Sequence, residues 1–274
     1  MDIFQRTGKK GMDFIRYILV LFALLYLSIK VIWTNRDLGQ RDFIKQVLIQ
    51  IYFTGVQAIL PVTVVAVLVG TSVIVSTLGG LGGVLSGGHN IGKMVTVIII
   101  REIAPLMTGG LVIVRSITAI TTELGYMRVQ REIEALESMG ISPVRHLLTP
   151  RIFGGLFSLF GLNVVFNAVA LIIGFVLAQF LVSLSGEVFF SNVFSAITPM
   201  DLIGLFLKIG VGGTGIFLIA CYHGMSVGLS SSQVPVEVSK ASLNSLVFLL
   251  TVNFTVSFLM LLYHDKSAWF GGLV

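Results

Sequence analysis

Residues 52–78, YFTGVQAILPVTVVAVLVGTSVIVSTL, decide the fold class of this chain. They contain no Asp, Glu, Lys or Arg, and the charge-free run extends from Gln46 to Asn90. A helix that spans a bilayer needs about 20 predominantly apolar residues. The stretch therefore predicts a first transmembrane helix. Pro61 and Gly70 are compatible with it, because neighbouring helices can satisfy the backbone groups that a kink frees.

The composition of the whole chain supports a membrane protein. Of its 274 residues, 55% are hydrophobic and 11% are charged, against roughly 25% charged residues in an average soluble domain. A soluble fold could not cover its surface with so few charges. The single cysteine, Cys221, excludes an internal disulfide framework and a cysteine-built metal site. The net charge of +5 collects beside the hydrophobic runs, which argues against a nucleic-acid partner.

We predict an all-α membrane protein with about five transmembrane helices, plus an N-terminal interfacial helix within residues 1–40 and a short cytoplasmic helix. The spans fall near residues 52–78, 95–124, 152–184, 202–225 and 241–263, within a membrane domain at 41–265 that is followed by a tail at 266–274. The N-terminal apolar run, residues 17–33, is bracketed by charges and short for a span. An interfacial helix is favoured there over a complete crossing.

The distribution of Lys and Arg predicts the orientation. Eight lie in residues 1–50, four in residues 125–151 and one, Lys240, in the loop before the last span, whereas the opposite side has only Lys93 and Lys266. Cytoplasmic loops carry the excess of positive charge. We therefore expect a cytoplasmic N-terminus and a C-terminus on the outer side.

Two glycine-rich motifs resemble nucleotide sites without the required context. Residues 87–94, GGHNIGKM, have the P-loop spacing, but Met94 replaces the required Ser or Thr. Residues 210–215, GVGGTG, lie inside a predicted span with no βαβ unit around them. Both motifs are better explained by close helix packing. The four histidines show no metal-ligand spacing, and no nucleophile–base pair stands out. We predict no enzyme activity, no metal site and no cofactor bound by this chain.

Ionisable residues in the second predicted span are the first candidate site. Arg101, Glu102, Arg115 and Glu123 all lie there. Such residues are costly inside a membrane, and they usually face the protein interior or a polar cavity. A functional pathway is the favoured interpretation for Arg101 and Glu102. For Arg115 and Glu123 the favoured interpretation is a network that pairs and holds helices together.

A short amphipathic segment, residues 129–140, is the second candidate site. Ile133, Leu136 and Met139 recur at helical spacing, with glutamates between them. Gly140 is a natural helix stop. We expect the apolar stripe to dock into a groove of a partner protein. The alternative is a helix packed under its own bundle or on the lipid surface.

Three groups of residues resemble the MlaE/YrbE permeases, the membrane subunits of ABC transporters associated with MCE-domain proteins. They are Arg101-Glu-Ile-Ala-Pro105, Arg115 with Thr122-Glu-Leu-Gly125-x-Met127, and Glu132-x-x-Ala-Leu-x-x-Met-Gly140-x-x-Pro143. The resemblance runs from about Arg41 to Met260. Asn253 departs from the family at a commonly acidic position of the last helix, and Lys240 stands where Arg is usual.

The resemblance implies a permease that moves phospholipid or a related hydrophobic lipid between the inner membrane and the cell envelope. It implies a homodimer in the cell inner membrane, two separate ATPase subunits that use ATP on the cytoplasmic side, and an MCE-protein oligomer on the outer side. A stand-alone channel or ion-coupled carrier, and a structural anchor of an envelope complex, are the alternatives.

The resemblance also implies roles for particular residues. Arg101 and Glu102 would face a lipid pocket lined by apolar residues of the first span, among them Val73 and Leu78. Residues 130–140 would form the coupling helix that contacts the ATPase. The residues implied there are Glu132, Ile133, Ala135, Leu136, Met139 and Gly140.

Overall fold

The computed structural model of the chain describes residues 2–34, 40–79, 97–182 and 185–271, with side chains described over 15–31, 41–77, 98–181 and 185–262. Within these ranges it contains helices and no strands, and five helical segments are long and apolar enough to span a membrane. They are Arg41–Thr77, Ile98–Val129, Val144–Leu181, Pro199–Met225 and Ser231–Leu262. The predicted all-α class and the five predicted spans are confirmed.

Short 3-10 and π segments interrupt the spans. The elements are α1 (Asp2–Thr34), α2 (Gln40–Thr54), η1 (Val56–Ala58), α3 (Ile59–Gly79), η2 (Val97–Ile103), α6 (Ala104–Val112), η3 (Ile113–Ile117), α7 (Thr118–Val129), α8 (Glu132–Ser138), η4 (Val144–Leu148), α9 (Thr149–Val182), α10 (Gly186–Ala196), α11 (Pro199–Met225), η5 (Ser231–Gln233) and α12 (Val234–Gly271). The first glycine-rich motif, residues 87–94, lies outside the described residues.

The first span begins earlier than residue 52, because α2 continues through η1 into α3. The chain bends at Gly55, where the 3-10 turn η1 replaces the regular helix. Residues 41–45 form the start of this long segment and belong to α2, which packs against α9. The second and fifth spans likewise extend beyond their predicted ends, to Val129 and from Ser231.

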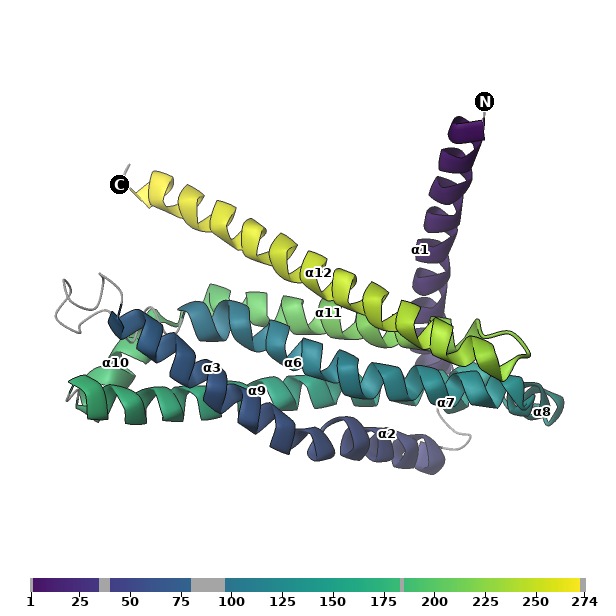
Figure 1. The fold of residues 1–274 in the computed structure, drawn as a ribbon, viewed down its shortest axis with the longest axis horizontal. Coiled ribbons are helices and arrows are strands. Elements are labelled where there is room, and N and C mark those ends of the chain that lie inside the picture. Colours follow the sequence, from purple (N-terminus) through teal and green to yellow (C-terminus); the bar gives the residue numbers. More distant parts are fainter. Residues whose placement is uncertain (1, 35–39, 80–96, 183–184, 272–274) are drawn as a thin grey trace.

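The spans form one bundle around α9, which contacts α2, α3, α6 and α11, while α12 packs on α11 and α7 (Figure 1). Small residues set the closest approach. A Cβ atom added at Gly70 of α3 would lie 2.9 Å from the carbonyl oxygen of Ala170 in α9. Gly212 and Gly213 of the second glycine-rich motif are buried in α11. A Cβ atom at Gly213 would lie 2.9 Å from the side chain of Leu159 in α9, so this glycine allows close packing between the two helices.

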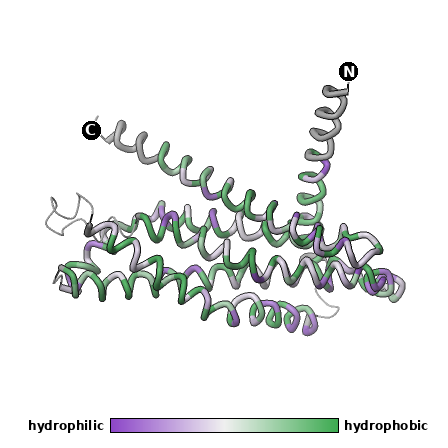
Figure 2. The backbone as a smooth tube through the Cα atoms, in the orientation of Figure 1, coloured by the Kyte–Doolittle hydropathy of each residue, from purple (hydrophilic) through white to green (hydrophobic). Residues whose placement is uncertain are grey.

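The outer surface of the bundle is apolar along most of its length. Leu60, Phe180 and Phe254 are among the large hydrophobic side chains that remain more than two-thirds exposed. Figure 2 shows hydrophobic colour along α3, α9 and α12, with hydrophilic stretches towards the end that carries α2 and α8. A surface of this kind is stable in lipid, which takes the place of water around the bundle.

Helix α10 was not predicted from the sequence. It is a short amphipathic helix whose Phe189 and Val193, four residues apart, are buried against Phe175 of α9 and Ile197. Eleven residues are too few to span a bilayer. Helix α10 lies against the end of α9 that is opposite α8 (Figure 1).

Helix α1 crosses the direction of the spans at a steep angle and meets the bundle only with its C-terminal half (Figure 1). Leu21, Leu24 and Leu25 pack against the main core. Tyr17 lies edge-on to Tyr222 of α11, with ring centroids 4.8 Å apart. Burial there raises the pKa of Tyr17 to about 12. Among the described residues α1 is not one of the five segments suited to span a membrane.

Candidate functional site

A charged cluster lies in the half of the bundle away from α8, and it begins at the π-helix η2. Pro105 has no backbone N–H, so it cannot close a helical hydrogen bond onto the carbonyl of Arg101. The ammonium group of Lys208, from α11, donates to that carbonyl oxygen at 2.6 Å. Single π-helical turns are frequent at functional sites. The proline and the π turn together leave the carbonyl oxygen of Arg101 free to accept a hydrogen bond from Lys208, which lies in another span.

The guanidinium of Arg101 pairs with Asp201 at the start of α11. Its Nε lies 2.6 Å from Oδ1, and its Nη2 donates to Oδ2 at 2.8 Å. Asp201 is buried and also accepts from the backbone N–H and the hydroxyl of Thr198, which completes a capping box. An acidic residue in the first helical turn is stabilised by the helix dipole. One edge of the guanidinium is therefore occupied, and the Arg101 side chain keeps 33% of its surface exposed.

The carboxylate of Glu102 accepts hydrogen bonds from side chains of the last two spans. Lys208 lies 3.1 Å away, Asn253 donates at 3.2 Å, and the hydroxyl of Ser257 reaches both carboxylate oxygens at 2.9 Å. Lys208 is almost fully buried, whereas 42% of the Glu102 side chain is exposed. The cluster thus holds two cations and two carboxylates, with Arg101 and Glu102 open on its accessible side.

The sequence identified two members of this cluster and missed the others. Asp201, Lys208 and Ser257 were not predicted, and Asn253 stood out only as a departure from the family. Lys208 could have been singled out from the sequence as a candidate site residue, because it is the only Lys, Arg, Asp or Glu between Leu202 and Met225.

The apolar residues predicted to line a lipid pocket are placed less directly. Val73 of α3 is partly buried against the main core, and α3 contacts η2, which carries Arg101 and Glu102. The side chain of Leu78 lies outside the described residues.

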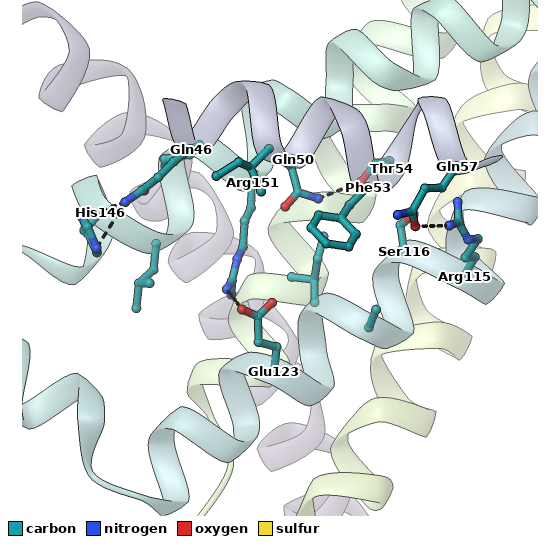
Figure 3. Close-up of a pocket in the computed structure, with 15 residues that line it drawn as sticks. Gln46, Gln50, Phe53, Thr54, Gln57, Arg115, Ser116, Glu123, His146 and Arg151 are labelled. Carbon is teal, nitrogen blue, oxygen red and sulfur yellow. Dashed lines mark hydrogen bonds and ion pairs between the residues drawn. The ribbon is translucent and has the colours of Figure 1, made fainter. Parts of the chain in front are cut away.

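Arg115 and Glu123 bind other elements rather than each other. Arg115, in the π-helix η3, donates to the side-chain oxygen of Gln57 at 2.7 Å. Glu123 pairs with Arg151 of α9 at 2.8 Å. Both residues line one cavity of about 620 Å³ between α2, α7 and the start of α9 (Figure 3). The structure therefore links the second span to the first and third at these two positions.

Helix α8 joins the second and third spans at the opposite end of the bundle. It ends in a Schellman motif, in which Ile141 N–H donates to Leu136 O and Gly140 N–H to Glu137 O, both at 3.0 Å. Gly140 has a φ of +76°, in the left-handed region that favours glycine. The helix stop predicted at Gly140 is in place.

The apolar stripe of α8 is divided between the bundle and the surface, which corrects the expectation that all of it is free for a partner. Ile133 is fully buried, and Leu136 packs partly against the main core. Met139 remains 64% exposed. Glu132, Ala135 and Gly140 are exposed as well. The exposed surface of α8 and its C-cap therefore includes Glu132, Ala135 and Met139.

Comparison with known proteins supports this architecture. The family model "Permease MlaE" matches residues 47–259. The chain is 23% identical to the intermembrane phospholipid transport system permease protein MlaE of Haemophilus influenzae, over 77% of this chain and 81% of that protein. It is 24% identical to a probable ABC transporter permease protein of Rickettsia felis, over 63% of this chain and 66% of that protein.

A plant relative is also similar. The chain is 25% identical to the chloroplastic protein TRIGALACTOSYLDIACYLGLYCEROL 1 of Arabidopsis thaliana, over 62% of this chain and 48% of that protein. The matched segment thus spans slightly less than two thirds of the Rickettsia relative and about half of the plant relative. With a family match over most of its length and five apolar spans, this multi-pass membrane protein belongs to the MlaE permease family.

Proposed function

We propose that this chain is the membrane subunit of an ABC transporter that moves phospholipid or a related lipid between the inner membrane and the cell envelope. The family match carries the proposal, together with the phospholipid transport in the name of the Haemophilus influenzae relative. ATP hydrolysis belongs, in this proposal, to separate ATPase subunits on the cytoplasmic side. A homodimer of the chain would face an MCE-domain protein on the outer side.

The exposed part of α8 is the proposed contact with the ATPase. Ile133 and Leu136 anchor α8 to the bundle, so movement imposed on Met139 and Ala135 would pass directly to α7 and the second span. The far end of that span carries Arg101 and Glu102. A displacement of α8 would thus be transmitted through the second span to the charged cluster around Arg101 and Glu102.

The charged cluster around Arg101 and Glu102 is the proposed contact for the lipid headgroup. Asp201 occupies one edge of the Arg101 guanidinium, and the remaining donors can reach an anionic headgroup because Arg is suited to phosphate recognition. Lys208 and Asn253 hold Glu102 beside it.

Reconstitution of the full chain with its co-purified ATPase in vesicles containing fluorescent phospholipid tests the proposal. Met139→Asp should abolish ATP hydrolysis that depends on the permease, because it places a charge on the docking surface. Met139 is a better target than Leu136, whose partial burial makes Leu136→Asp a folding variant as well. Leu229→Asp, at a 61% exposed residue in the loop before η5, is the control and should leave hydrolysis unchanged.

Arg101→Ala separates the alternatives. A lipid permease loses ATP-dependent lipid transfer in this variant, whereas a structural anchor retains it. An ion-coupled carrier moves its substrate without the ATPase. Lipid transfer that persists in Arg101→Ala, or that needs no ATP, would contradict the proposed function.

A further inference from the structure

The cavity lined by Arg115 and Glu123 has the features of an anion site. Its walls come from α2, η1, η3, α7, η4 and the start of α9, so several segments far apart in the sequence build it. Figure 3 shows polar side chains from these segments facing one another across it. The residues that line it include Ile49, Phe53, Ile120 and Leu147 on the apolar side and Gln46, Gln57, Arg115, Glu123, His146 and Arg151 on the polar side.

Arg151 is the main residue of this candidate anion site. Its side chain is nine-tenths buried, and an ion pair joins its Nη2 to Glu123 at 2.8 Å. Its Nη1 atom is buried with no hydrogen-bond partner among the described residues. A buried guanidinium with unused donors is costly unless an acceptor completes it. The partner carboxylate of Glu123 is 63% exposed, so it pairs with Arg151 from the open side of the cavity.

Arg115 is a second arginine that lines this cavity, and it is half-buried. Its Nη2 donates to Gln57, and its Nη1 is buried with no hydrogen-bond partner among the described residues. Arg115 precedes Glu123 by eight residues, about 12 Å along a helix, on the side away from α8. Two guanidinium groups and one carboxylate leave the cavity with one surplus positive charge when His146 is neutral.

We propose that this cavity binds the phosphate group of a membrane phospholipid from the leaflet on the α8 side. Arg151 is the phosphate ligand in this arrangement, and Arg115 donates at the depth of the glycerol esters. The acyl chains leave along Ile49 and Phe53, which are 46% and 56% exposed on the outer face of α2. Basic pockets between transmembrane helices on the cytoplasmic side are typical lipid headgroup sites.

This site is distinct from the charged cluster around Arg101 and Glu102, which lies in the other half of the second span. The inference does not depend on the proposed transport activity, because binding is measured on the full chain alone. A free phosphate ion would use the same Arg151 donors. The experiment therefore compares a phospholipid, its phosphate-free analogue and inorganic phosphate.

Native mass spectrometry of the detergent-solubilised full chain, titrated with phosphatidylglycerol, diacylglycerol or inorganic phosphate, tests the proposal. Arg151→Gln should weaken phosphatidylglycerol binding about tenfold or more, as expected for the loss of a charge-assisted hydrogen bond. Glu123→Gln should strengthen it, because it removes the competing carboxylate. Arg115→Gln should weaken phosphatidylglycerol but not phosphate. Arg128→Gln, which removes an equal charge outside the cavity, is the matched control and should have no effect.

Since Glu123 is largely exposed, Glu123→Gln tests the site even if Arg151→Gln lowers stability, which its melting temperature would reveal. Diacylglycerol should bind far more weakly than phosphatidylglycerol. Competition by millimolar phosphate that is lost in Arg151→Gln would also support a phosphate site. Equal binding of phosphatidylglycerol by the wild-type chain, Arg151→Gln and Glu123→Gln would overturn the proposal, as would diacylglycerol binding as tightly as phosphatidylglycerol.

Discussion

At the scale of single residues, Lys208 holds together the charged cluster around Arg101 and Glu102. It joins the freed carbonyl of Arg101 and the carboxylate of Glu102, and it is almost fully buried. Truncating one member of a buried ion pair is costly because the remaining charge loses its partner. The exposed half of Glu102 reduces that cost here, since part of the carboxylate can be solvated.

We predict that Lys208→Met lowers the free energy of unfolding by about 2 kcal/mol, measured by thermal unfolding in detergent. Adding Glu102→Gln should recover part of the loss, because it removes the charge left without a partner. Lys240→Met is the matched control. Its Lys–Glu pair is at the surface, with 55% of the Lys240 side chain exposed, so its removal should cost less than about 1 kcal/mol. Equal losses for the two lysines would show that burial does not govern the Lys208 pair.

At the scale of elements, the contact between α3 and α9 depends on a missing side chain. Gly70 lets the two helices approach until its own Cα faces the backbone of Ala170. Gly161, elsewhere on α9, has open space around it. Close approach of this kind is how membrane helices gain packing energy when lipid competes equally for apolar surface.

We expect Gly70→Ala to lower the melting temperature, because the new Cβ atom would lie 2.9 Å from a backbone oxygen and force the helices apart. Overpacking typically costs about 1–3 kcal/mol. Gly161→Ala should be neutral or stabilising, since alanine has the higher helix propensity and meets no neighbour. The same sign for both variants would argue against close packing at Gly70.

At the scale of the whole molecule, the bundle has two unlike ends. Helix α8 and the loop before η5 lie at one end, and α10 lies at the other (Figure 1). The excess of Lys and Arg predicts that the α8 end faces the cytoplasm. Cys221 is fully buried, so an introduced cysteine can be labelled without interference.

This orientation is testable with a membrane-impermeant maleimide on sealed membrane vesicles. Ser138→Cys in α8 should be labelled in inverted vesicles only, and Ser191→Cys in α10 in right-side-out vesicles only. Both serines are exposed, so a lack of labelling reflects the membrane barrier. The wild-type chain, with its buried cysteine, is the control. Labelling of Ser138→Cys from the outside would reverse the topology.

Some features of this protein follow from its local sequence, and others depend on contacts between residues far apart in the chain. Five spans, the family and the helix stop at Gly140 follow from the sequence, because hydropathy runs and a left-handed glycine are local properties. The amphipathic helix α10 was missed, because its two buried residues, Phe189 and Val193, gain their meaning only from contact with α9.

The functional pairings were decided by the tertiary structure. Arg101 and Asp201, or Glu102 and Lys208, are about one hundred residues apart in sequence, and only helix packing brings them within hydrogen-bond distance. Helix packing likewise brings Arg151 and Arg115, from different spans, to the walls of one cavity. A charged residue inside a span predicts that a polar or charged partner lies next to it. Which partner it is depends on the faces that neighbouring helices turn towards each other.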